Sequence, residues 1–300
     1  MTAPAIIVAP DGLEPGDLSP QALRLLARAD QVPVAASSYP ERLLAAVGAL
    51  ACGVAPVSAL GDGLAAQGAV LRFDPISMRP DLAGLVVLDG RAFALTEDES
   101  RALFEAAAAI FGASGMELVF GAPLRWYALS EALPDAALTP LPDAAGMRAH
   151  KVMPGGREGA ALRALMNEVQ MALHAHPVNA AREARGELPV NSIWPWGGGL
   201  APPVPVPDQT VEAIIGAGDD PLARGLAECL RVPFHQGETG SDTTPGGCVV
   251  ALERASPETL SAWLEQRRRT GFDLRLKAGC WRYRPRHALR LWRRRAVPPS

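Results

Sequence analysis

The residues best suited to chemistry gather between His176 and Gly199, in the segment HPVNAAREARGELPVNSIWPWGGG. Arg182 and Arg185 each offer a planar fork of N–H donors that suits phosphate or carboxylate. Asn179 and Asn191 can orient a ligand hydroxyl, and the closing glycines permit a close backbone approach. These residue types predict a pocket for a small anionic metabolite. The predicted ligand-binding residues are Arg125, Asn179, Arg182, Arg185, Asn191, Trp194, Trp196 and Gly197.

The same segment also has a purely structural interpretation. Asparagine side chains bridge loops, tryptophans anchor a proline-rich crossover, and glycines turn the chain. Residue types alone favour this second interpretation. The contacts of these side chains in the structure distinguish the ligand-binding interpretation from the structural one.

A second candidate site lies in one loop, where His235, Glu238 and Asp242 are close enough in sequence to share a metal ion. Thr243 and Thr244 follow directly and are candidate nucleophiles. The four cysteines are far apart and form no CxxC pair, so neither a zinc knuckle nor a disulfide framework is predicted. A reducing compartment is expected.

The net charge of −3 is unevenly distributed over the 300 residues. From Arg267 to Ser300 there are twelve Lys or Arg and one acid, Asp273, which gives +11 and leaves −14 for the rest of the chain. Such a tail can bind nucleic acid or an anionic membrane, and it can equally fold back on an acidic body. Trp281, Tyr283 and Trp292 stand among the arginines. The strand-like spacing favours a hairpin with inward aromatics, and a nucleic-acid surface is kept as an alternative.

The elements that would position these residues alternate between strand and helix. An apolar run at 5–9 ends in Pro10, Asp11 and Gly12, which places a polar loop at the carboxyl end of a buried strand. Further strands are predicted at 85–88 and 116–120, and a hairpin at 272–277 and 280–284. Helices are predicted at 20–29, 41–50, 96–111, 158–176, 220–230 and 257–270, with a short one starting at Pro177. The run from Pro189 to Pro207 predicts an ordered, irregular crossover.

This alternation predicts an α/β fold with a mixed sheet covered by helices. We expect an N-terminal region at 1–150 and a C-terminal region at 151–300, which could form one continuous domain. The uncharged stretches at 43–61 and 188–207 are too rich in Ala, Gly and Pro to span a membrane. With no secretory signal visible, we expect a cytoplasmic protein without a membrane partner, and no oligomeric state is predicted.

Part of the sequence resembles the archaeal-type cofactor-independent phosphoglycerate mutases of the alkaline phosphatase superfamily. The resemblance is carried by LMNE at 165–168, HPVN at 176–179, and the NSIWPWGGG run that starts at Asn191. That run, with Asp74-Pro75 and Arg125-Trp126-Tyr127, is similar to a proteobacterial branch catalogued as a regulator of pathogenicity factors. The match extends most clearly over residues 165–203.

The resemblance implies a reduced alkaline-phosphatase-like core, a Ser or Thr nucleophile and two divalent metals held by Asp and His, Mn or Zn if the protein is an enzyme. Asp11 matches in position the first metal-binding Asp of the family. The other ligands are not evident, since the loop of His235, Glu238 and Asp242 lacks the usual spacing. We therefore expect a mutase-like protein with a degenerate metal site that binds an anionic metabolite in a regulatory role. The alternative is an active metal-dependent mutase or phosphatase.

Overall fold

The computed structural model describes residues 4–33, 37–82, 84–112, 114–205, 210–237, 247–290 and 293. The chain forms two compact units: unit 1 contains residues 1–51 and 204–300, and unit 2 contains residues 52–203. The boundary expected between residues 150 and 151 falls inside unit 2, within α6 (Ala149–Val152). The difference arises because strands from both ends of the chain pair in one sheet of unit 1.

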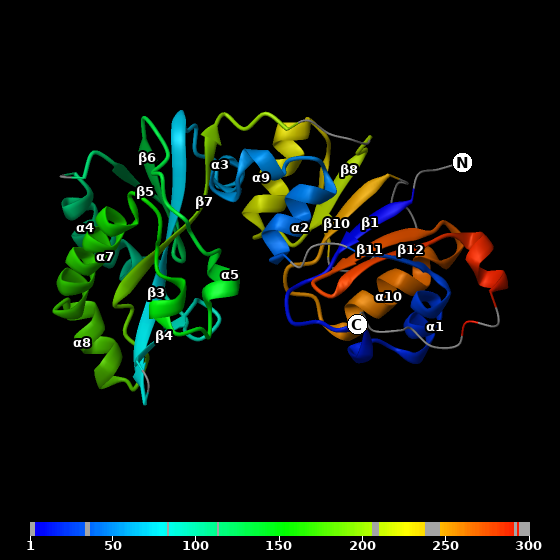
Figure 1. Ribbon diagram of the computed structural model, residues 1–300, viewed down its shortest axis with the longest axis horizontal. Coiled ribbons are helices and arrows are strands. Elements are labelled where there is room, and N and C mark those ends of the chain that lie inside the picture. Colours follow the sequence, from blue (N-terminus) through cyan, green and yellow to red (C-terminus); the bar gives the residue numbers. More distant parts are fainter. Residues whose placement is uncertain are drawn as a thin grey trace. The chain divides into compact units, whose positions relative to one another are not determined.

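Unit 1 is built on a seven-stranded mixed sheet with the order β2-β12-β11-β1-β10-β8-β9 (Figure 1). Five neighbouring strands, β11 to β9 in that order, run parallel, and β12 is antiparallel to both of its neighbours. The strands are β1 (Ala5–Val8), β2 (Asp30–Val32), β8 (Ala213–Gly216), β9 (Phe234–Gln236), β10 (Cys248–Ala251), β11 (Phe272–Leu276) and β12 (Gly279–Tyr283).

In the described part of the chain, the helices that cover this sheet are α1 (Pro20–Arg28), α2 (Tyr39–Ala46), α9 (Pro221–Leu230) and α10 (Pro257–Gln266). One face packs against α1 and α10, in a buried cluster that includes Ile7, Leu26, Val250 and Trp263. The α2 helix packs against β1, and α9 against β8 and β9. Side-chain caps fix the helix starts: Ser19 Oγ accepts from Ala22 N–H at α1.

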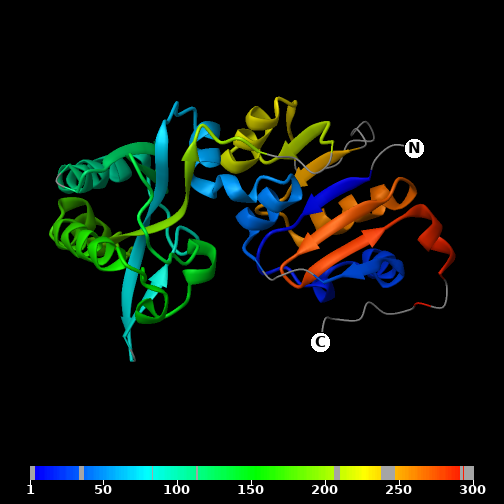
Figure 2. The same cartoon turned by 45° about the horizontal axis from the view of Figure 1, so that its top comes forward.

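Unit 2 contains an antiparallel sheet around the long strand β3 (Gly68–Asp81), which pairs with three others. Its partners are β4 (Gly84–Leu88), β6 (Arg125–Ser130) and β7 (Ser192–Ala201), and β5 (Glu117–Ala122) pairs with β6. The helices are α3 (Val54–Gly61), α4 (Glu97–Phe111), α5 (Leu141–Ala144), α6, α7 (Gly159–His174) and α8 (Pro177–Ala184). Figures 1 and 2 show α4, α7 and α8 on one side of this sheet and α3 on the other.

Alternating side chains on β6 serve the two faces of the unit 2 sheet. Trp126 packs toward α4, where Phe104 lies edge-on with ring centroids 5.5 Å apart. Tyr127 points to the opposite face and packs with Ala55, Ala59 and Val70 under α3. Both rings are fully buried, so β6 anchors both layers.

The α/β class with a mixed sheet is confirmed, and so are the helices at α1, α4, α7, α9 and α10 and the hairpin of β11 and β12. The irregular crossover predicted after Pro189 is wrong, since β7 is a strand along β3 despite Pro195. Glycines in β7 let it lie close to the chain at Cys52 and Gly53. None of the helices in the described residues is long and apolar enough to cross a bilayer.

Candidate functional site

A buried group of charged and aromatic side chains lies on the α3 face of the unit 2 sheet. It joins two arginine–carboxylate pairs from β3, β6 and the end of α3, together with a tyrosine and a tryptophan that donate to the carboxylates. We call it the paired-arginine cluster. Its members are Asp62, Arg72, Asp74, Arg125, Tyr127 and Trp196.

Arg125 forms a bidentate pair with Asp62, the residue that ends α3. Arg125 Nε and Nη2 donate to Asp62 Oδ2 and Oδ1 at 3.0 and 2.9 Å. Tyr127 Oη donates to Asp62 Oδ2 at 2.7 Å. Burial would raise the pKa of Asp62, but the Arg125 and Tyr127 donors hold that pKa below its usual range. Asp62 is therefore a fixed anion that aims the Arg125 fork.

Arg72 and Asp74, two residues apart on β3, point to the same face and form the second pair. Arg72 Nε and Nη2 donate to the Asp74 carboxylate at 2.9 and 2.6 Å, and Trp196 Nε1 donates to Asp74 Oδ2 at 2.9 Å. The Arg72 guanidinium lies 4.6 Å from the centroid of the Trp196 ring, which adds a cation–π contact. Burial opposes the charge of Arg72, and the nearby Asp74 carboxylate still raises the Arg72 pKa.

Both guanidinium groups keep donors for a ligand. Within the described residues, Nη1 of Arg72 and Nη1 of Arg125 make no hydrogen bond. The two side chains remain partly exposed, at 11% and 19%. Two oriented cationic forks that face water at one end are suited to bind phosphate or carboxylate. This cluster includes two of the predicted ligand-binding residues, Arg125 and Trp196.

Two other predicted binding residues lie beside the start of α4: Arg182 on α8, and Arg185, which caps the C-terminus of α8. Arg182 is 1% exposed, and all three of its guanidinium nitrogens donate within the chain, to Leu188 O, Glu99 Oε2 and Ala94 O. Arg185 is half exposed and pairs with Glu99 and Glu187. In these positions the two arginines join α8 to α4.

The predicted asparagines bridge backbone segments of unit 2. Asn179 Nδ2 donates to Leu173 O and Val190 O, while its Oδ1 accepts from Val190 N–H at 2.8 Å. Asn191 Oδ1 accepts from Met78 N–H at 2.7 Å, and its Nδ2 donates to Met78 O at 3.0 Å. Asn191 directly precedes β7, and its side chain thereby continues the hydrogen bonding between β7 and β3.

Trp194 and Gly197 are also engaged inside unit 2. Trp194 is fully buried, and its Nε1 donates to Thr139 O at 2.9 Å. Gly197 has a φ of +71°, and a Cβ there would lie 3.0 Å from Val54 Cβ. The observed contacts of these residues match the structural interpretation, and a ligand role for them stays a prediction.

In unit 1, Asp11 follows β1 at the carboxyl edge of the parallel strands, where α/β sheets bind ligands. Its Oδ1 accepts from Arg42 Nη1 at 2.9 Å and its Oδ2 from Tyr39 N–H at 3.0 Å. Arg42 is buried and also donates from Nη2 to Ala9 O. A guanidinium thus lies beside the carboxylate that the resemblance assigns to a metal.

Asp220 follows β8 at the same edge, and both of its carboxylate oxygens also accept hydrogen bonds. Its Oδ2 accepts from Tyr39 Oη at 2.8 Å, and its Oδ1 accepts from the N–H groups of Leu222 and Ala223. Burial and the negative charges of Asp220 and Glu253 raise the pKa of Tyr39 well above its usual value. Tyr39 therefore stays protonated and keeps its donor on Asp220.

The predicted metal ligands are not brought together where the structure describes them. His235 is exposed on β9, and two strands separate β9 from β1, which Asp11 follows. Both carboxylate oxygens of Asp11 already accept hydrogen bonds, and the described residues contain no group of three or more His, Cys, Asp or Glu that could hold a metal ion. A metal role for Asp11 stays a prediction. Glu238, Asp242, Thr243 and Thr244 lie outside the described residues.

Part of the sequence is similar to named phosphoglycerate mutases. A 2,3-bisphosphoglycerate-independent phosphoglycerate mutase of Methanosarcina barkeri is 30% identical over 184 residues, which cover 59% of this chain and 46% of the relative. A probable mutase of the same kind from Geobacter sulfurreducens is 30% identical over 205 residues, or 66% and 51% of the two chains. Part of this chain is homologous to these mutases. It spans about half the length of the relatives that it matches.

No protein-family model matches the sequence. The solved structure of the cofactor-independent phosphoglycerate mutase from Thermoplasma acidophilum is matched with a TM-score of 0.40 at 17% identity, over 94% of this chain and 90% of that one.

Several residues of these sites escape sequence reasoning. Gly61-Asp62-Gly63 has the composition of a plain turn, yet Asp62 orients both Arg125 and Tyr127. From the sequence, Asp220 can be predicted only as a helix cap, and not as the acceptor of Tyr39. Arg72, an isolated arginine in an apolar run, offers one signal, since Arg72 and Asp74 at a spacing of two fall on the same face of a strand.

Proposed function

We propose that this protein is related to phosphoglycerate mutases but has a degenerate metal site, and that it binds a small phosphorylated or carboxylated metabolite in a regulatory role. The binding residues would be Arg72 and Arg125, with Asp62 and Asp74 holding the two forks. The sequence predicts Arg125 as a binding residue, and the contacts of Arg72 add that residue to the site. The homology to mutases supports phosphoglycerate as the first ligand to test.

The observation that carries the proposal is the contrast between the two carboxylate environments. In unit 2 the carboxylates orient arginines that still have a free N–H group. In unit 1 the carboxylate expected to bind a metal is instead paired with a buried arginine, Arg42, whose positive charge opposes a divalent cation. This contrast supports anion binding in unit 2 without a metal bound at Asp11.

Native mass spectrometry with Mn and 3-phosphoglycerate tests both halves of the proposal. We expect one phosphoglycerate and no stoichiometric metal per chain. Two bound metals with transfer of phosphate between the phosphoglycerate hydroxyls would overturn it in favour of an enzyme that uses Asp11, His235, Glu238 and Asp242, with Thr243 or Thr244 as nucleophile.

Calorimetry on charge-conserving variants then tests the binding residues. Arg72→Lys and Arg125→Lys keep the charge but lose the fork, so Kd for 3-phosphoglycerate should rise roughly tenfold in each. Arg101→Lys, which affects an exposed pair with Glu97, is the matched control and should leave Kd unchanged. Equal affinities for all variants would refute the site.

The nucleic-acid alternative has less support from the contacts of the basic segment. Arg290 and Arg293 lie within ion-pair distance of Asp30, and Arg284 pairs with Asp273. Trp281 and Tyr283 are buried in the core of unit 1, which leaves neither ring for stacking on bases. Trp292 lies outside the described residues, and nucleic-acid binding stays a prediction.

A further inference from the structure

The hairpin of β3 and β4 in unit 2 has an exposed end. Residues 79–82 of β3 and its turn, and residues 84 and 85 of β4, are all exposed. Figures 1 and 2 show this end of β3 running past the other strands of the unit. A two-stranded ribbon with both faces uncovered gains little from packing, so its side chains are available for another role.

The two faces of this ribbon differ in chemistry. Pro80 pairs with Leu85, and this face is apolar at its exposed end. The same face continues into Met78 and Val87, which are buried, and Met147 lies on the far side of Val87. Leu82 at the tip, Leu85 and Met147 are 110%, 37% and 42% exposed. Two-residue turns usually carry Gly, Asn or Asp rather than leucine. An exposed leucine at this position lowers solubility and does not stabilise the turn.

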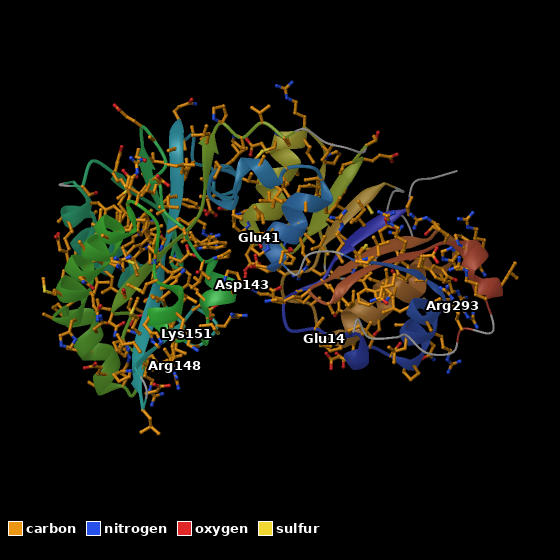
Figure 3. All side chains as sticks on the ribbon, viewed as in Figure 1. Glu14, Glu41, Asp143, Arg148, Lys151 and Arg293 are labelled. Atoms are coloured by element: carbon orange, nitrogen blue, oxygen red, sulfur yellow. The ribbon has the colours of Figure 1, made fainter. Side chains whose placement is uncertain are left out.

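The other face is basic. Arg79 on β3 pairs with Val86 on β4, and Val86 in turn bridges to Arg148, which lies outside the strands, so two arginines flank one valine. Figure 3 shows Arg148 and Lys151 beside this end of the unit. Among the described residues, no ion pair involves Arg79, Arg148 or Lys151. The one acid on this face is Asp81.

This basic face contrasts with the rest of the unit. Residues 52–203 contain 16 Asp or Glu and 11 Lys or Arg, a net charge of −5, yet three of the cations without an ion pair gather at this ribbon. An apolar tip beside cations suits a surface that is both anionic and apolar. Stable protein interfaces bury roughly 800 Å² and about 20 to 30 residues a side, which a ribbon end of this size does not provide.

We propose that the β3–β4 ribbon docks reversibly on an anionic lipid surface, with Leu82 and Leu85 in the acyl boundary and Arg79, Arg148 and Lys151 at the headgroup phosphates. A few apolar side chains with a basic patch give weak, reversible membrane binding. Each cation near an anionic surface strengthens partition roughly fivefold. Surface docking of this kind needs no spanning helix. It revises the expectation of no membrane partner, which rested on the absence of spanning segments.

Co-sedimentation of the full chain with vesicles tests the proposal. The protein should sediment with phosphatidylcholine vesicles that contain phosphatidylglycerol, and not with phosphatidylcholine alone. Leu82→Glu, and separately the double variant Arg79→Glu with Arg148→Glu, should lower the bound fraction roughly tenfold or more. Raising the salt concentration should weaken the binding of the wild type.

Two substitutions elsewhere on unit 2 serve as controls. Met171 on α7 is 71% exposed, and Arg157 is an exposed cation paired with Asp135. Met171→Glu and Arg157→Glu should bind vesicles like the wild type. Binding that survives the ribbon variants would be due to the basic segment of unit 1 and would overturn the proposal. No sedimentation with either vesicle would overturn it as well and would favour a protein partner for the ribbon.

Discussion

Arg42 Nη1 lies 2.9 Å from Oδ1 of Asp11, directly after the carboxyl end of β1. Through this pair and the bond from Arg42 Nη2 to Ala9 O, the α2 helix is fixed to the end of the first strand. Arg42 Nε is buried and has no hydrogen-bond partner among the described residues. The guanidinium therefore has a desolvation cost that only the ion pair and the carbonyl contacts offset.

Arg42→Met tests how much this pair contributes. Removing the guanidinium leaves Asp11 without its counter-ion, so the free energy of unfolding should fall by roughly 2–4 kcal/mol, as measured by urea denaturation. Arg101→Met removes an exposed i,i+4 pair with Glu97 and a cation–π contact with Phe120, and should cost less than about 1 kcal/mol. If Arg42→Met were as stable as the wild type, the pair would not be a structural link.

Asn179→Ala separates the structural interpretation of the HPVN segment from a ligand role. The substitution removes the three hydrogen bonds of a buried amide and leaves Val190 N–H and O without partners. We expect a loss of roughly 2–3 kcal/mol in the free energy of unfolding. The exposed Asn167 on α7 provides the control, and Asn167→Ala should change stability little. A stable Asn179→Ala variant that no longer binds 3-phosphoglycerate would instead support a ligand role.

The elements with strong local signals could be predicted from the sequence. The α4 helix has Thr96 as its cap and Glu99 three residues later, and the two side chains make the reciprocal bonds of a capping box. The β11–β12 hairpin follows from its alternation of apolar and basic residues. Such signals lie within a few neighbouring residues, so they survive whatever the rest of the chain does.

The remaining features depend on long-range pairing. The β7 strand looks irregular because Pro195 and three glycines lie in it, and only its pairing along β3 makes it a strand. The paired-arginine cluster joins residues that are far apart in the sequence. Asp62 and Arg125 are 63 positions apart, and Arg72 contacts Trp196. Residue types alone cannot show which arginines have carboxylate partners. Arg182 and Arg125 are equally suited to bind an anion by type, but only Arg125 keeps an unbonded nitrogen.

Glu99 makes the stability of unit 2 depend on pH. Burial would raise its pKa, but Thr96 N–H, Arg185 and Arg182 lower it below the usual value. A depressed pKa in the folded state means that the stabilisation is complete above the unfolded pKa of roughly 4.3 and is lost as pH falls through the folded value. Glu99→Gln should therefore be less stable than the wild type at pH 7, and this difference should shrink toward pH 3.

Urea unfolding at both pH values measures this effect. Glu105→Gln, an exposed change on the same helix, should show no such pH-dependent difference from the wild type. A Glu99→Gln deficit that persists unchanged at low pH would mean that shape and hydrogen bonding, rather than charge, account for the role of Glu99.

Gly199→Ala tests whether the glycine-rich end of β7 exists for chain packing or for a ligand. A Cβ at Gly199 would collide with Cys52 O and lie 2.9 Å from Pro56 Cγ, so the start of α3 would have to move off the strand. Overpacking of this kind should lower the free energy of unfolding by about 2–3 kcal/mol. Gly112 is the control, because a Cβ there would have nothing within 4 Å and its φ of −54° is an ordinary helical value. Gly112→Ala should be neutral or up to about 1 kcal/mol more stable, because alanine restricts the unfolded chain. If Gly199→Ala folds with wild-type stability, the close approach of Cys52 to β7 is not what requires glycine there, and a ligand role for the segment regains support.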